Sequence, residues 1–143
     1  MYSSGSMVHV VLEGLTFLSI LFPMSIVLAA DSTTTRPEPK VITLDPDIKE
    51  YMVVLGGPPE TVTMRSGHVI LIPGESVGKH TTGTFEELVV VFEGKGKMQI
   101  TDGATLLLEA GSVAYCPPHT EHDVINTGPG RLRYLYIVAM AQQ

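Results

Sequence analysis

The sequence contains no tryptophan and a single cysteine, Cys116, among its 143 residues. A lone cysteine excludes an internal disulfide and a cysteine-based zinc cluster. Basic residues are also few, with 9 Lys and Arg against 15 Asp and Glu and a formal net charge of -6, and no run of five basic residues occurs. Because binding to a nucleic-acid backbone needs clustered Lys and Arg, we expect no nucleic-acid partner.

Residues 1–30 have the composition of a targeting segment. Residues 15–30 (LTFLSILFPMSIVLAA) are apolar and end in Ala29 and Ala30, and the chain turns polar at Asp31. This is the pattern of a signal peptide with its cleavage site, although the preceding residues lack Lys and Arg and include Glu13. The run is shorter than the ~20 residues that span a bilayer. We therefore predict an exported protein, periplasmic or secreted, with an uncleaved membrane anchor as the alternative.

Residues 31–40 (DSTTTRPEPK) read as a linker, because threonine, proline and charged residues dominate them. From residue 41 to residue 143 the pattern is β throughout, and no stretch keeps a helical period beyond one or two turns. A single helical turn is expected at 45–50, and Asp102-Gly103 predicts a two-residue hairpin turn. The expected strands are 41–44, 51–55, 61–66, 68–72, 76–81, 87–93, 97–101, 105–109, 112–116, 122–126 and 132–138. Many short strands at this spacing predict an all-β sandwich or barrel.

Strand parity places candidate ligands on common faces. Residues two apart on a strand share a face, so Glu87 shares one with Val89 and Val91, whereas Glu86 lies on the opposite face. On the same reasoning, His80 and Thr82 point the same way if their strand continues that far. Two imidazoles and one carboxylate from three strands would form the donor set that holds non-haem Fe(II) with open positions, and Zn, Mn and Ni accept similar sets.

The spacing of the stretch 74–94 matches a known motif. Gly74 is followed by five residues and then by His80, and Thr82 stands two residues after His80. Six residues separate Glu87 from Gly94. This resembles the first motif of the cupin superfamily, G-x5-H-x-H-x(3,4)-E-x6-G, with Thr82 in the place of the second histidine.

A second stretch, 111–126, resembles the second cupin motif, G-x5-P-x-G-x2-H-x3-N. Gly111 leads by five residues to Pro117, and His119, His122 and Asn126 follow at the motif's spacing, with His119 in the place of the glycine. Both motifs in order imply a single-domain cupin β-barrel of the double-stranded β-helix, or jelly-roll, type over residues 41–143.

The resemblance implies metal ligation by His80, Glu87 and His122. The usual cupin site has three histidines and one glutamate, so Thr82 is the departure. It leaves two alternatives open: a three-ligand site in which the Thr82 hydroxyl positions a water or substrate oxygen, or a site that no longer binds metal. Thr82 and Tyr115 are the candidate catalytic residues, and Tyr115, one strand from this site, would line the pocket.

Other residues have more ordinary interpretations. His119 is expected to be an exposed loop histidine, although a substrate-facing role is the alternative. We expect Asn126 to be a structural hydrogen-bonding residue and His68 to be structural. Cys116 is a reactive thiol or, as is commoner, a buried inert one.

The resemblance implies two classes of function. The first is a mononuclear metal-dependent enzyme that acts on a small molecule, dioxygenase- or isomerase-like, with Fe(II) favoured over Mn, Ni or Zn. The alternative is a non-catalytic module that binds a small ligand, a sugar or an acid, with a structural metal or none. Because cupins commonly pair through outer strands, a homodimer is expected, with an edge strand such as 41–44 at the contact. A membrane is expected as a partner only through an uncleaved N-terminal segment.

Overall fold

The computed structural model describes residues 36–141, in which all regular structure is β. The predicted signal segment and the first half of the linker, residues 31–35, therefore lie outside the described residues. Over residues 36–141, no helix is long and apolar enough to cross a membrane.

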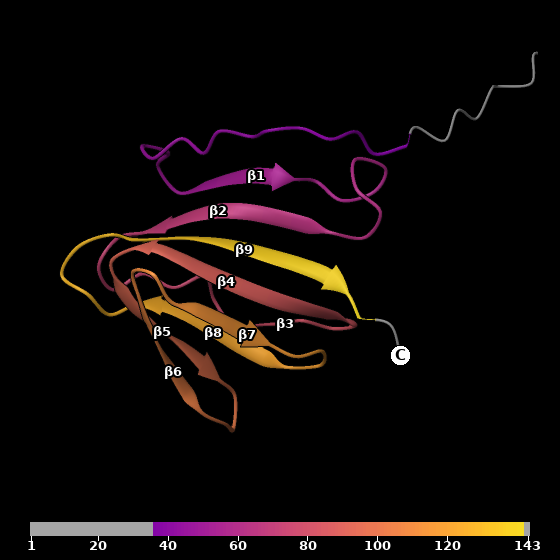
Figure 1. Cartoon of the computed structure of the whole chain (residues 1–143). Coiled ribbons are helices and arrows are strands. Elements are labelled where there is room, and N and C mark those ends of the chain that lie inside the picture. Colours follow the sequence, from indigo (N-terminus) through magenta and orange to yellow (C-terminus); the bar gives the residue numbers. More distant parts are fainter. Residues whose placement is uncertain (1–35, 142–143) are drawn as a thin grey trace, which may run out of the picture. The chain divides into compact units, whose positions relative to one another are not determined.

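Within residues 36–141, nine antiparallel strands form two sheets, which face each other (Figure 1). The five-stranded sheet has the order β1-β2-β9-β4-β7, and the four-stranded sheet has the order β3-β8-β5-β6. The strands are β1 (Tyr51–Leu55), β2 (Arg65–Leu71), β3 (His80–Thr81), β4 (Phe85–Glu93), β5 (Lys95–Ile100), β6 (Thr105–Glu109), β7 (Val113–Cys116), β8 (Glu121–Asn126) and β9 (Leu132–Met140).

The hydrophobic core lies between the two sheets and follows the period of two. On β4, Val89 and Val91 are buried, whereas Leu88 and Phe92 are more than one third exposed. The parity predicted for this strand is therefore confirmed. Met98 of β5 and Val124 of β8 are buried from the opposite sheet. Each such side chain stabilises the fold by about 1.5–3 kcal/mol through burial of apolar surface.

One predicted strand and the predicted helical turn, both just before β1, are wrong. Residues 41–44 pair with no strand, and Val41 is 95% exposed. Residues 45–50 form a bend, in which the Asp45 carboxylate accepts a hydrogen bond from the Asp47 N–H, and the predicted helical turn is wrong. A short run of β-branched and apolar residues does not make a strand unless its backbone N–H and C=O groups pair with a neighbouring strand.

Two further expectations about β boundaries need correction. The predicted strands 61–66 and 68–72 are one strand, β2, which begins only at Arg65. The predicted strand 76–81 is regular only at its end, because Gly78 has a φ of 83° and interrupts the extended chain. A single bridge from Ser76 to Ile125 remains at its start.

The predicted hairpin between β5 and β6 is present, and its turn is longer than expected. The Ile100 N–H donates to the Ala104 carbonyl, and the Gly103 N–H donates to the Ile100 carbonyl. The residue with positive φ is Asp102, at 53°, a conformation that aspartate tolerates better than most residues.

Candidate metal centre

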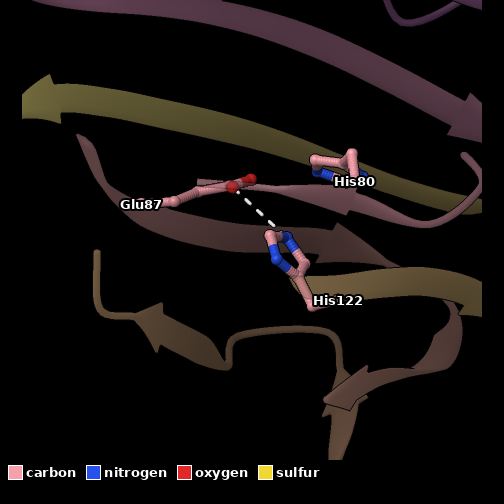
Figure 2. Close-up of side chains that lie close together, drawn as sticks. All are labelled: His80, Glu87 and His122. Carbon is pink, nitrogen blue, oxygen red and sulfur yellow. Dashed lines mark ion pairs between the residues drawn. The ribbon is translucent and has the colours of Figure 1, made fainter. Parts of the chain in front are cut away.

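The two sheets bring three predicted ligands to one point. His80 on β3 and His122 on β8 face each other directly in the register of the four-stranded sheet, with ring centroids 4.3 Å apart. Glu87 approaches from β4 in the opposite sheet (Figure 2). One ligand atom from each residue lies within 4.8 Å of the other two. Residues separated by more than forty positions in the sequence therefore form one cluster.

The His122 ring is fixed by its surroundings. The side chain is fully buried, and its Nδ1 lies 3.3 Å from the Thr120 carbonyl oxygen. A carbonyl only accepts hydrogen bonds, so Nδ1 carries a proton, and in the neutral ring Nε2 keeps a lone pair. Nε2 makes no hydrogen bond among the described residues, and it lies 3.3 Å from Glu87 Oε2. Two lone-pair atoms at this distance call for a cation between them.

The His80 ring is oriented in the same way, although it is exposed. Its Nδ1 lies 2.9 Å from the Gly78 carbonyl oxygen and must donate to it. Nε2 is therefore the atom left for a ligand. Backbone carbonyls that fix the second nitrogen of a histidine in this way are typical of metal-binding imidazoles.

The electrostatics of the cluster favour a positive charge. Burial lowers the pKa of His122, but the Glu87 carboxylate, the Thr120 carbonyl and Asp123 raise it by more, so that it lies above its usual value. The charged form is therefore favoured at a fully buried position. A cation placed between Glu87 and His122 would satisfy the same preference.

The donor set fits a divalent transition metal. Two imidazole nitrogens and one carboxylate oxygen are a set that Fe, Mn, Ni and Zn accept. Donors around one ion at about 2.1 Å lie at most about 4.2 Å apart, so a small inward movement of the side chains would close the cluster. The Nε2 of His122, buried without a hydrogen-bond partner, is the observation that most needs such an ion.

Thr82 lies at the cluster, but its hydroxyl is engaged elsewhere. The buried Oγ1 donates to the Pro117 carbonyl and accepts from the Thr120 N–H. Its proton is therefore not free to orient a water or substrate oxygen, as one sequence interpretation expected. Thr82 instead ties the end of β3 to the loop before β8, and this loop sets the direction of His122.

Tyr115 does not line the interior. On β7, Ala114 and Cys116 are buried, whereas Tyr115 points to the outer face, is half exposed and donates a hydrogen bond from its hydroxyl to Glu86. Its expected place at the pocket therefore needs correction. Glu86 faces outward and Glu87 inward, as parity predicted.

The remaining motif residues have structural positions. His119 is exposed in the loop before β8 with a φ of 57°, a conformation that explains why glycine suits this place. The buried Asn126 side chain donates to the carbonyls of Leu71 and Gly130 and accepts from the Gly128 N–H. Burial, with the nearby Glu87 carboxylate, raises the pKa of the Cys116 thiol, which agrees with an inert cysteine.

A cavity of about 810 Å³ opens beside the cluster and is lined by His80, Thr82 and Glu87. Its wall includes Arg65, a residue that sequence reasoning did not single out. The sequence predicts two strands, 61–66 and 68–72, where the structure has the single strand β2. With that division, strand parity does not show that Arg65 lies on the same face as the inward-facing residues Val69 and Leu71.

Comparison with protein families agrees with this architecture. A cupin-domain profile matches residues 67–138, about half of the chain. Among the solved structures, a cupin protein from Bacteroides fragilis matches with a TM-score of 0.62 at 19% identity, over 73% of this chain and 86% of that chain. A cupin 2 conserved barrel domain protein from Salinispora arenicola matches with a TM-score of 0.60 at 21% identity, over 73% and 91%. At these identities the likeness shows the fold alone.

A third structure has a higher sequence identity over a shorter match. It is described as a predicted oxalate decarboxylase from Thermotoga maritima, and it matches at 26% identity with a TM-score of 0.51. The match covers 54% of this chain and 66% of that chain, so this chain spans just under two thirds of that relative. No curated protein matches the sequence.

Proposed function

The chain belongs to the cupin superfamily, and on this premise we propose that it binds one divalent metal ion through His80, Glu87 and His122 and acts on a small molecule in the adjoining cavity. The observation that carries the proposal is the buried His122 Nε2, which has no hydrogen-bond partner among the described residues and faces Glu87 at 3.3 Å. A metal ion held there would supply a Lewis acid or a redox centre.

Different residues of the chain would bind the metal ion and orient its ligands. His80 Nε2, His122 Nε2 and a Glu87 oxygen would hold the ion on one side and leave its cavity side open. The backbone carbonyls of Gly78 and Thr120 keep both imidazoles in the binding orientation. Glu87 and His122 are buried, so their side chains are shielded from bulk water. With two histidines and one carboxylate, we favour Fe(II) over Mn, Ni or Zn, and a dioxygenase- or isomerase-like enzyme.

A second candidate is a non-catalytic binding module for a sugar or an acid. The observation that favours it is the engagement of Thr82, because the residue in the place of a fourth ligand is committed to holding a loop. The cavity remains large enough for a small ligand whether or not a metal is bound. The relative from T. maritima, described as a predicted oxalate decarboxylase, is compatible with a small acid in either case.

Metal content measured by elemental mass spectrometry tests the proposal. Untagged wild-type protein should contain close to one iron, manganese, nickel or zinc atom per chain, and His122→Ala should lose it. His119→Asn is the matched control, because it removes an exposed histidine of the loop before β8 that is not one of the three clustered residues, and it should keep the metal. Metal absent from the wild type even after reconstitution would refute the metal site and leave the binding module.

Export and a homodimer stay predictions. The segment that predicts export lies outside the described residues. Residues 41–44 form no strand, so we no longer expect two copies to pair through them. Exposed apolar side chains on the outer faces of β4 and β7, among them Leu88, Phe92 and Val113, support a dimer instead. Light scattering on the pure protein checks this, and the mass of a single chain would contradict it.

A further inference from the structure

The strand register places Arg65 level with the candidate metal centre. Arg65 on β2 pairs with Val138 on β9, and Val138 pairs on its other side with Glu87 on β4. All three line the cavity, so they lie in one row of its wall. Neighbouring strands are about 4.8 Å apart, which puts the backbones of Arg65 and Glu87 roughly 10 Å apart.

Arg65 is exposed at the rim of the cavity, and among residues 36–141 its guanidinium makes neither an ion pair nor a hydrogen bond. By contrast, Arg131 and Arg133 both pair with Glu93. Packing holds the Arg65 side chain in place, because its guanidinium carbon lies 4.8 Å from the centre of the Phe85 ring and its stem passes close to Gly57. Five N–H donors on a positively charged, planar fork are therefore available to a ligand.

A pair of tyrosines adds a donor beside Arg65. The hydroxyls of Tyr51 and Tyr136 lie 2.8 Å apart, and their rings are stacked. Tyr136 pairs with Gly67, the next inward-facing position after Arg65 on β2. One hydroxyl donates to the other, so the second keeps its proton for a ligand. Burial and the hydrogen bond with Tyr51 raise the pKa of Tyr136, which keeps this phenol protonated at neutral pH.

The acidic side chains that share the cavity wall, apart from Glu87, lie at its other end. Glu50 is level with Ile70, whose N–H donates to the Glu50 carbonyl, and this is five residues, or roughly 16 Å, along β2 from Arg65. The Glu75 carboxylate accepts the Ile72 N–H. Glu50 and Glu75 are thus kept away from Arg65, and the acidic side chain level with Arg65 is Glu87, whose carboxylate faces His122.

We propose that the cavity takes a small carboxylic acid with a second oxygen donor, whose carboxylate binds Arg65 and the Tyr51–Tyr136 pair while the second donor reaches the metal centre. The acid is favoured over a sugar because a neutral ligand would cover the guanidinium without pairing its charge. The metal end of this assignment rests on the proposed function, whereas the carboxylate end rests on Arg65 and the tyrosines.

Calorimetric titration with dicarboxylates tests the assignment. Succinate, glutarate and adipate offer two carboxylates at three different separations, and glutaramide is the uncharged control. With zinc-loaded wild-type protein, we expect at least one dicarboxylate to bind and glutaramide to bind more weakly. Arg65→Gln should weaken that binding roughly ten- to hundredfold, because a charge-assisted hydrogen-bond pair is lost. Arg65→Lys should recover part of it, and Tyr51→Phe should weaken it a few-fold. Arg36→Gln, with the same change of charge at an exposed site, should bind as the wild type does.

Metal content, measured on the same samples, separates this inference from the proposed function. Arg65→Gln should keep its metal, since Arg65 is not one of the ligands. Dicarboxylate binding that is equal in wild type and Arg65→Gln, or absent for all three acids in the wild type, overturns the inference and leaves a metal-loaded protein intact. Binding that depends on Arg65 in a protein that holds no metal supports the carboxylate site and refutes the metal centre.

Discussion

His68 shows how much a single side chain can depend on its surroundings. It is fully buried on β2, with its ring edge-on to Phe92, and neither ring nitrogen has a hydrogen-bond partner among the described residues. The sequence predicted only that it would be structural. Burial, with the charge of Arg133, lowers the pKa of His68, against a smaller opposing effect of Asp45. The imidazole is therefore held neutral in the folded protein.

This burial predicts a pH dependence of the free energy of unfolding. Because the folded pKa lies below the unfolded value of 6.5, the unfolded chain takes up the proton first as the pH falls. Stability should therefore decrease as the pH falls below 6.5 towards the folded pKa of His68. Urea unfolding at several pH values between about 7 and 5, around the usual histidine pKa, should show a smaller decrease for His68→Leu than for the wild type. His119→Asn, at an exposed loop position, should keep the wild-type slope, and equal slopes in all three proteins would contradict the assignment.

At the scale of the elements, glycines set where the chain crosses between the sheets. Gly94, between β4 and β5, has a φ of 88°, and a Cβ there would lie 2.1 Å from the Arg131 carbonyl oxygen. Gly111, before β7, has a φ of 85°, but a Cβ there would meet nothing within 4 Å. The sequence marks both as motif glycines. Only the structure shows that Gly111 needs to be glycine for its backbone conformation alone, whereas Gly94 needs to be glycine for its conformation and for lack of space.

The two glycines give a matched pair of substitutions. Gly111→Ala should cost about 1–2 kcal/mol of unfolding free energy, the cost of a left-handed conformation for a residue with a Cβ. Gly94→Ala should cost about 4 kcal/mol, because displacement of the backbone carbonyl adds to the same strain. Denaturant unfolding of both variants measures the difference, and equal losses would show that the contact with Arg131 is relieved without cost.

For the whole molecule, the candidate metal centre is a link between the two sheets. Glu87 belongs to the five-stranded sheet, and His80 and His122 belong to the four-stranded sheet. An ion bound by all three would stabilise the folded protein and not the unfolded chain. At a free metal concentration 100 times the dissociation constant, this linkage amounts to about 2.7 kcal/mol.

Thermal unfolding with and without zinc measures this link. The wild type should unfold about 10 °C higher with saturating zinc, given the entropy of unfolding of a domain of this size. Excess chelator should reverse the shift, and His122→Ala should show none. A shift of the same size in His122→Ala would mean that zinc binds elsewhere on the chain.

The sequence by itself determined most of the β elements and the identity of the three clustered residues. A period of two separates Glu87 from Glu86, and motif spacing selects His80 and His122, because both are properties of a short stretch of chain. The pairing of strands depends on residues far apart in the sequence, and it decided which predicted strands form and which side chains reach the cavity. Residues 41–44 have the composition of a strand but pair with no strand among the described residues. Arg65 reaches the cavity because two registers, β2 with β9 and β9 with β4, place it level with Glu87.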